Sequence, residues 1–188
     1  MAVTTLDPQT ALIVIDLQKG IVAREAAHPT SEIVARAAQL AEAFRAHKLP
    51  VVLVKVTATA PGRSDQSRGG SMTLPAEWTE LAPELNQQAQ DHVVEKRTWG
   101  AFVETDLMDY LTRQGVTQVV MAGVATSIGV ESTARQAYEA GFNVTLAIDA
   151  MTDMSADAHE NSVTRIFPRL GETGSAQDII NLLNIRPS

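Results

Sequence analysis

The chain has 188 residues, a formal net charge of −7 and no cysteine. This length suits one domain, and we expect residues 1–188 to form a single domain that buries a sufficient core without metals or disulfides. The negative charge argues against a nucleic-acid partner, because nucleic acids select basic surfaces. The absence of cysteine excludes disulfides, zinc–thiolate sites and thiol nucleophiles.

The opening stretch, MAVTTLDPQT, is polar and lacks the basic and apolar segments of a signal peptide. No apolar run approaches the roughly 20 residues that a bilayer-spanning helix needs. We therefore expect a cytoplasmic protein with no membrane partner, which binds a small molecule.

Strand-length apolar runs alternate with longer segments whose apolar residues recur every three or four positions. The first pattern predicts buried strands and the second predicts amphipathic helices. In chain order, the predicted elements are a strand at 11–16, a helix at 31–48, a strand at 51–56, an irregular segment at 57–83, a strand at 92–95, a helix at 105–115, a strand at 118–122, a helix at 127–140, a strand at 143–148, a helix at 156–166, a weak strand at 172–174 and a helix at 176–183.

Several single residues suggest where helices begin and end. Ser31 is expected to be an N-cap, and Gly115 and Gly141 are expected to end helices. Pro168 argues against continuation of the helix before it. The irregular segment 57–83, rich in Gly, Ser, Arg and Pro, either carries specificity or is a solvated connector.

Continuous apolar strands alternating with helices predict an α/β fold with a mostly parallel sheet covered on both faces. Ligands of such sheets bind at the carboxyl ends of the strands. Polar or glycine-rich sequence follows three predicted strands, at Asp16, at Lys96 and at residues 123–133. Asp16 is either a general acid or base or a structural residue that caps the next segment or pairs with a cation. Lys96 is either functional or an ordinary surface lysine. The turn at 123–133 is either a plain connection or an anion site made by backbone N–H groups.

The chain resembles the isochorismatase-like, or cysteine hydrolase, superfamily in three segments that occur in the family's order, ALIVIDLQKG, EKRTWGAFVETDL and MAGVATSIGVESTARQAYEAGFNVTLAIDAMTD. The resemblance implies a Rossmann-like three-layer α/β/α sandwich and a site built from Asp16 and Lys96 beside the helix after Ile128. It also implies a cis peptide at Val124–Ala125 and self-association into a dimer or larger oligomer.

The chain departs from the family's patterns at the site. Gly129 stands where the amidase branch carries its nucleophilic cysteine. The stretch matching the metal cluster of nicotinamidases has no histidine, so we expect no metal and no other cofactor. Ala125 and Ser127 stand where isochorismatases usually carry an aromatic residue and a histidine. Ser127 is a candidate pocket residue, but it does not occupy the nucleophile's position.

True isochorismatases work without a thiol: a carboxylic acid protonates the alkene carbon of a vinyl ether, and water adds to the resulting cation. By resemblance, Asp16 is the acid, and Lys96 with Arg63 or Arg68 holds substrate carboxylates. Two further residues, Gln18 and Trp99, are expected to shape the pocket, although Trp99 could equally belong to the core.

The function expected from these features is hydrolysis of a small, anionic, vinyl-ether-type substrate without a covalent intermediate. Two alternatives stay open. The protein could be a non-catalytic member that binds a small molecule or a partner protein, or an amide or imide hydrolase in which Asp16 activates water.

Overall fold

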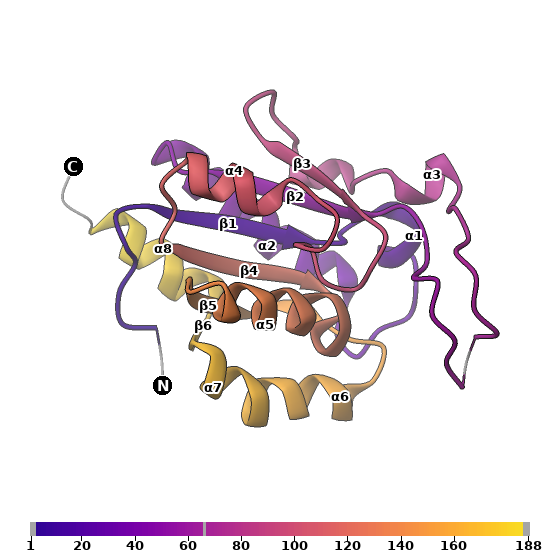
Figure 1. Cartoon of the computed structure of the whole chain (residues 1–188). Coiled ribbons are helices and arrows are strands. Elements are labelled where there is room, and N and C mark those ends of the chain that lie inside the picture. Colours follow the sequence, from indigo (N-terminus) through magenta and orange to yellow (C-terminus); the bar gives the residue numbers. More distant parts are fainter. Residues whose placement is uncertain (1–2, 66, 186–188) are drawn as a thin grey trace.

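The computed structural model describes residues 3–65 and 67–185, and its centre is a parallel sheet in the strand order β3-β2-β1-β4-β5-β6 (Figure 1). Each neighbouring pair of strands is parallel. The strands are β1 (Thr10–Ile15), β2 (Val51–Val56), β3 (His92–Lys96), β4 (Gln118–Val124), β5 (Asn143–Thr152) and β6 (Glu172–Gly174).

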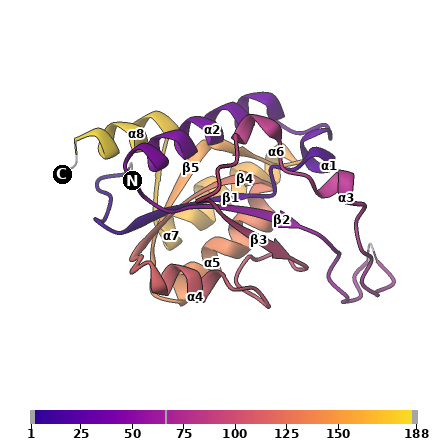
Figure 2. The ribbon, with the colours of Figure 1, turned by 90° about the horizontal axis from the view of Figure 1, so that it is seen from above.

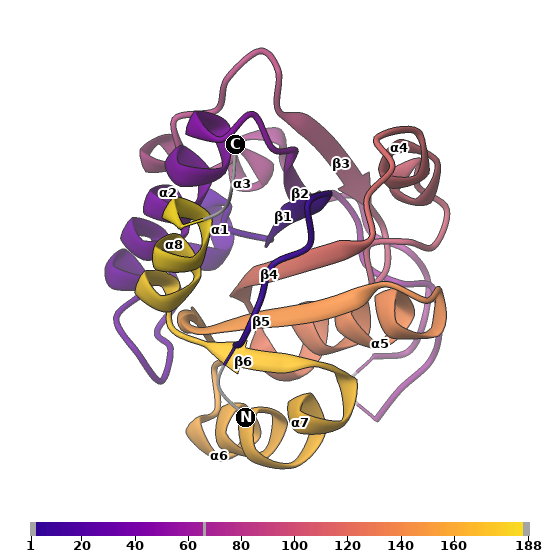
Figure 3. The same ribbon diagram turned by 90° about the vertical axis from the view of Figure 1, so that its left-hand side faces the viewer.

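Helices cover both faces of the sheet, which gives the three-layer α/β/α sandwich that the sequence predicts (Figures 2 and 3). One face carries α2 (Thr30–Ala46) and α8 (Ala176–Asn184), which pack against each other. The opposite face carries α4 (Leu107–Arg113), α5 (Glu131–Glu139) and α7 (Phe167–Leu170). The remaining helical segments are α1 (Lys19–Val22), α3 (Ala76–Thr79), η1 (Pro83–Leu85), η2 (Thr126–Val130), α6 (Ala156–Asn161) and η3 (Ser162–Ile166).

The sequence of the central strand β1 is a continuous apolar run because both of its faces are buried. Leu12 and Val14 face the core under α2 and α8, whereas Ala11, Ile13 and Ile15 face the core under α4 and α5. Because side chains alternate between the two faces of a strand, both sets must be apolar when both faces are covered.

No helix among the described residues is long and apolar enough to cross a membrane.

The structure confirms the predicted strands, with β4 and β5 extending further than expected. Short helical turns, α3 and η1, interrupt the segment predicted to be irregular. The helix predicted over residues 127–140 begins as the π-helical turn η2. Gly115 and Gly141 follow helices with φ of 66° and 90°, as expected of glycines at helix ends.

Two predictions about helix boundaries are wrong. Helix α2 begins at Thr30, after Pro29, and no side chain caps it, so Ser31 lies inside the helix. The helical path also continues past Pro168, which lies in the first turn of α7. The turn η3 directly before it is π-helical, and proline is tolerated in the first turn of the helix that begins after it.

Candidate active site

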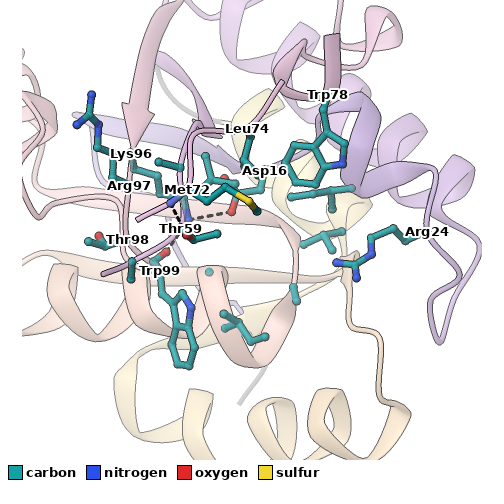
Figure 4. Close-up of a pocket in the computed structure, with 18 of the residues that line it drawn as sticks. Asp16, Arg24, Thr59, Met72, Leu74, Trp78, Lys96, Arg97, Thr98 and Trp99 are labelled. Carbon is teal, nitrogen blue, oxygen red and sulfur yellow. Dashed lines mark hydrogen bonds and ion pairs between the residues drawn. The ribbon is translucent and has the colours of Figure 1, made fainter. Parts of the chain in front are cut away.

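The strand order reverses between β1 and β4, because β2 and β3 lie on one side of β1 and β5 and β6 lie beyond β4. In sheets of this kind the crevice at the carboxyl ends of these two strands is the usual ligand site. A cavity of about 520 Å³ lies there, and Asp16, Lys96 and Gly129 are among the residues that line it (Figure 4). Its size is that of a typical site for a small organic molecule.

Asp16 leaves β1 in a left-handed conformation, with φ of 52°. Its backbone N–H still donates to the carbonyl oxygen of Val54, at 2.9 Å, so the turn is attached to the sheet. Left-handed backbone is uncommon for residues other than glycine, although aspartate tolerates it better than most. The sharp turn directs the carboxylate of Asp16 into the crevice (Figure 4).

The Asp16 carboxyl group is almost fully buried, and its Oδ1 atom has no hydrogen-bond partner among the described residues. Burial raises the pKa of Asp16 from 3.8 to about 6, and the neighbouring Lys96 ammonium opposes part of that rise. A carboxylate oxygen without a hydrogen-bond partner favours the protonated form of the acid, which is the same direction as the raised pKa. Asp16 can therefore hold a proton near neutral pH and transfer it.

Lys96 is the last residue of β3 and its side chain is only 1% exposed. Its Nζ atom lies 2.8 Å from Asp16 Oδ2 and donates a second hydrogen bond, of 2.5 Å, to the carbonyl oxygen of Trp99. Lys96 therefore places a buried positive charge beside the acid, where an anionic group of a substrate would be stabilised.

The third part of the site is the turn from β4 into η2. The peptide between Val124 and Ala125 is cis, as the family resemblance implies. A Cβ atom added at Gly129 would lie 3.1 Å from Asp16 Oδ2 and 3.3 Å from Lys96 Nζ. The glycine at position 129 thus lets the Asp16–Lys96 pair lie close against the backbone of η2, where even a methyl group would be crowded.

The N–H groups at this helix start are largely occupied. Ile128 and Val130 both donate to the carbonyl oxygen of Ala125, each at 3.1 Å, and Ser127 donates to Asp153 Oδ2 at 2.7 Å. The sequence-based idea of an anion held by this turn therefore gains no support from these three groups.

The structure brings together five of the nine predicted site residues, since Trp99 and Ala125 also line the cavity with Asp16, Lys96 and Gly129. The other four do not line it. Gln18 is fully buried, and its side-chain amide accepts from the Val56 N–H and donates to the Val56 carbonyl, so it continues the sheet's hydrogen bonding beyond β1.

The remaining three predicted residues also lie outside the cavity. Ser127 donates its hydroxyl to Asp153 Oδ2 at 2.8 Å, and the carboxylate of Asp153 is thus engaged by both the hydroxyl and the N–H of Ser127. Arg63 and Arg68 are exposed on the long loop after β2. Substrate contacts therefore have to come from other side chains of the cavity.

The cavity side chains that the sequence did not single out include Arg24, Met72 and Trp78. Arg24 follows the short helix α1, which has too few residues for a helical pattern to be recognised. Trp78 lies in the segment predicted to be irregular, where a large aromatic residue among polar ones was the available signal. Within the described residues there is no group of three or more His, Cys, Asp or Glu side chains that could hold a metal ion.

Comparisons with known proteins point to one family. The isochorismatase domain model matches residues 10–178. The isochorismatase family protein YecD of Escherichia coli O157:H7 is 42% identical over 180 residues, which is 93% of this chain and 96% of that protein. YwoC of Bacillus subtilis, from the same family, is 39% identical over 178 residues, covering 92% and 93% of the two chains. Both relatives are described as uncharacterized. A solved structure of an isochorismatase family protein from Burkholderia thailandensis has a TM-score of 0.90 and 44% identity, over 96% of this chain and 98% of that one.

Proposed function

The chain belongs to the isochorismatase family, and from this premise we propose that it is a hydrolase of a small organic anion, with Asp16 as the proton donor and Lys96 as the adjacent cation. The observation that carries the proposal is the buried Asp16 carboxyl group, which lines the cavity, has a pKa of about 6 and has one oxygen without a hydrogen-bond partner among the described residues. A group with these properties is suited to general acid catalysis near neutral pH.

The reaction that we favour is hydrolysis of a vinyl ether that carries a carboxylate. Asp16 gives its proton to the terminal alkene carbon, which forms a C–H bond and leaves a cation shared by the other alkene carbon and the ether oxygen. Water adds to that carbon and returns a proton to the Asp16 carboxylate. The resulting hemiketal breaks its bond to the ether oxygen as its hydroxyl proton is lost and the ether oxygen gains a proton, which releases an alcohol and a 2-oxo acid such as pyruvate. Lys96 holds the carboxylate beside the reacting carbon throughout.

Position 129 supports a reaction without a covalent intermediate. The chain has no cysteine, and the glycine at this position offers no nucleophilic atom to a substrate. Gly129 lines the cavity beside the acid and the ammonium group, and it adds no reactive atom of its own there.

An amide or imide hydrolase is the second candidate, because the same carboxyl group in its ionised form could activate water. The two chemistries need opposite protonation states of Asp16. The third candidate, a non-catalytic binding protein, predicts that ligands bind in the cavity and are recovered unchanged. Self-association and a cytoplasmic location stay predictions.

The pH dependence of pyruvate release from isochorismate tests the favoured reaction. The pKa of Asp16 is raised to about 6, so the protonated acid predominates below that pH and its fraction falls about tenfold per pH unit well above it. We therefore expect kcat/KM to fall as pH rises above about 6. A rate that rises through about pH 6, or turnover of amides and imides with no pyruvate release, would contradict the general-acid role and favour the second candidate.

A further inference from the structure

Two charged residues that line the cavity, Arg24 and Arg97, have no part in the Asp16–Lys96 pair. Arg24 points into the cavity from the side opposite Lys96, with Asp16 between them, whereas the side chain of Arg97 points away (Figure 4). Both arginines are exposed. Among the described residues, no group accepts a hydrogen bond from the Arg24 guanidinium or forms an ion pair with it.

The segment that carries Arg24 is tied to the body of the protein at several points. The Arg24 N–H donates to the carbonyl of Ile21 at 3.0 Å, and the Ala27 N–H donates to the carbonyl of Asp153 at 2.8 Å. The Thr30 hydroxyl donates to the carbonyl of Val22, also at 2.8 Å. Arg24 therefore extends from a segment whose backbone is held before and after it.

The wall beside Arg24 is apolar and is built by close contact between two segments. The indole ring of Trp78 lies against the backbone of Gly20, where an added Cβ would come within 2.0 Å of the ring. The Lys19 N–H donates to the carbonyl of Glu80 at 2.8 Å, and the two side chains form an ion pair. Trp78 is thus fixed against α1, on the same side of the cavity as Arg24.

The charges that line the cavity favour an anion. One carboxyl group, Asp16, lies there with two cationic side chains, Lys96 and Arg24, although the whole chain has a net charge of −7. Two of the three N–H donors of the Lys96 ammonium are already used by Asp16 and Trp99. A guanidinium offers a planar pair of donors that matches a carboxylate, and that of Arg24 is uncommitted.

Resting on the proposed function, we propose that Arg24 is a specificity-determining residue that binds a carboxylate of the substrate at the end of the cavity away from Lys96. The substrate is then an organic acid whose apolar or ring-shaped body lies against Trp78, between that carboxylate and the alkene that Asp16 protonates. Arg24 takes the role that the sequence suggested for Arg63 and Arg68.

A binding experiment with a matched pair of probes tests this without any turnover. The probes are 3-phenylpropanoate and its neutral counterpart 3-phenylpropanamide. The chain has two tryptophans, Trp78 and Trp99, and both line the cavity, so intrinsic fluorescence reports on binding there. The variants are Arg24→Gln and, as a matched control, Arg97→Gln, which removes another exposed arginine whose side chain points away from the cavity.

We expect Arg24→Gln to weaken binding of the acid about tenfold and to leave binding of the amide within about twofold, as loss of one charge-assisted contact implies. Arg97→Gln should change neither value by more than about twofold. The proposal is overturned if the wild type binds both probes equally, if Arg24→Gln keeps the full preference for the acid, or if it weakens both probes alike. The proposed function is tested separately, by turnover. If no Asp16-dependent turnover is found, the preference of the cavity for the acid over the amide can still be measured.

Discussion

Asp16→Asn is expected to lower kcat/KM by a factor of about 10³ or more, the upper range of what a positioned general acid contributes. Asparagine keeps the size and shape of the side chain but has no acidic proton to give to an alkene carbon. Any residual rate should also lose its dependence on pH near 6, because the group whose pKa is raised to about 6 is no longer present. The measurement is kcat/KM for pyruvate release from isochorismate between pH 5 and pH 8.

The substitution has a structural cost that the experiment must separate from the chemical one. Lys96 is 1% exposed and would lose its anionic partner, which destabilises the folded state. Circular dichroism and thermal unfolding show whether the variant is folded at the assay temperature. Asp157→Asn, an exposed aspartate on α6, is the matched control and should keep full activity. A folded Asp16→Asn protein with undiminished turnover would remove Asp16 from the mechanism.

Gly123→Ala is expected to lower the free energy of unfolding by about 4 kcal/mol, or to prevent folding altogether. Gly123 has φ of 127°, and an added Cβ would lie 2.0 Å from the carbonyl oxygen of Ile15. That oxygen belongs to β1, which is hydrogen-bonded to strands on both sides and cannot move away without breaking the centre of the sheet. For a domain of this size the change corresponds to a fall in Tm of about 10 °C.

Gly115→Ala provides the comparison for this prediction. Gly115 also has a positive φ, of 66°, but an added Cβ would have no atom within 4 Å. That substitution therefore carries the backbone strain without the steric overlap and should cost about 1 kcal/mol. Urea unfolding of the two variants separates the effects. If Gly123→Ala costs no more than Gly115→Ala, the close approach of β1 and β4 does not determine stability here.

Much of the fold could be predicted from the sequence because its strands are buried on both faces. The run ALIVI at the start of the chain has no polar position, which in an α/β protein indicates a central strand, and it is indeed β1. The helix boundaries were harder to predict. Ser31 was predicted as an N-cap because serine is common there, but the helix begins one residue earlier, after Pro29. Pro168 was predicted to end a helix because proline usually does so, but it lies in the first turn of α7, where proline is tolerated.

The candidate site also has residues that the sequence could predict and residues that it could not. Asp16, Lys96 and Gly129 could be found because each follows or lies near a recognisable strand, and strand ends converge at one edge of a parallel sheet. Arg24 and Trp78 could not be assigned to the site, since their positions depend on packing between α1 and the segment around α3. Gln18 looked like a pocket residue because it is polar and close to Asp16, but its amide is fully used by the backbone of Val56.

The most direct test of the central claim is the isotopic composition of the alcohol released when isochorismate is hydrolysed in water enriched in oxygen-18. If Asp16 protonates the alkene carbon and water adds to the neighbouring vinyl carbon, the ring alcohol keeps the original ether oxygen. Mass spectrometry should then find no oxygen-18 in the ring product beside the released pyruvate. Oxygen-18 in the ring alcohol would mean that water attacks the ring carbon instead, and would contradict hydrolysis by protonation of the vinyl ether.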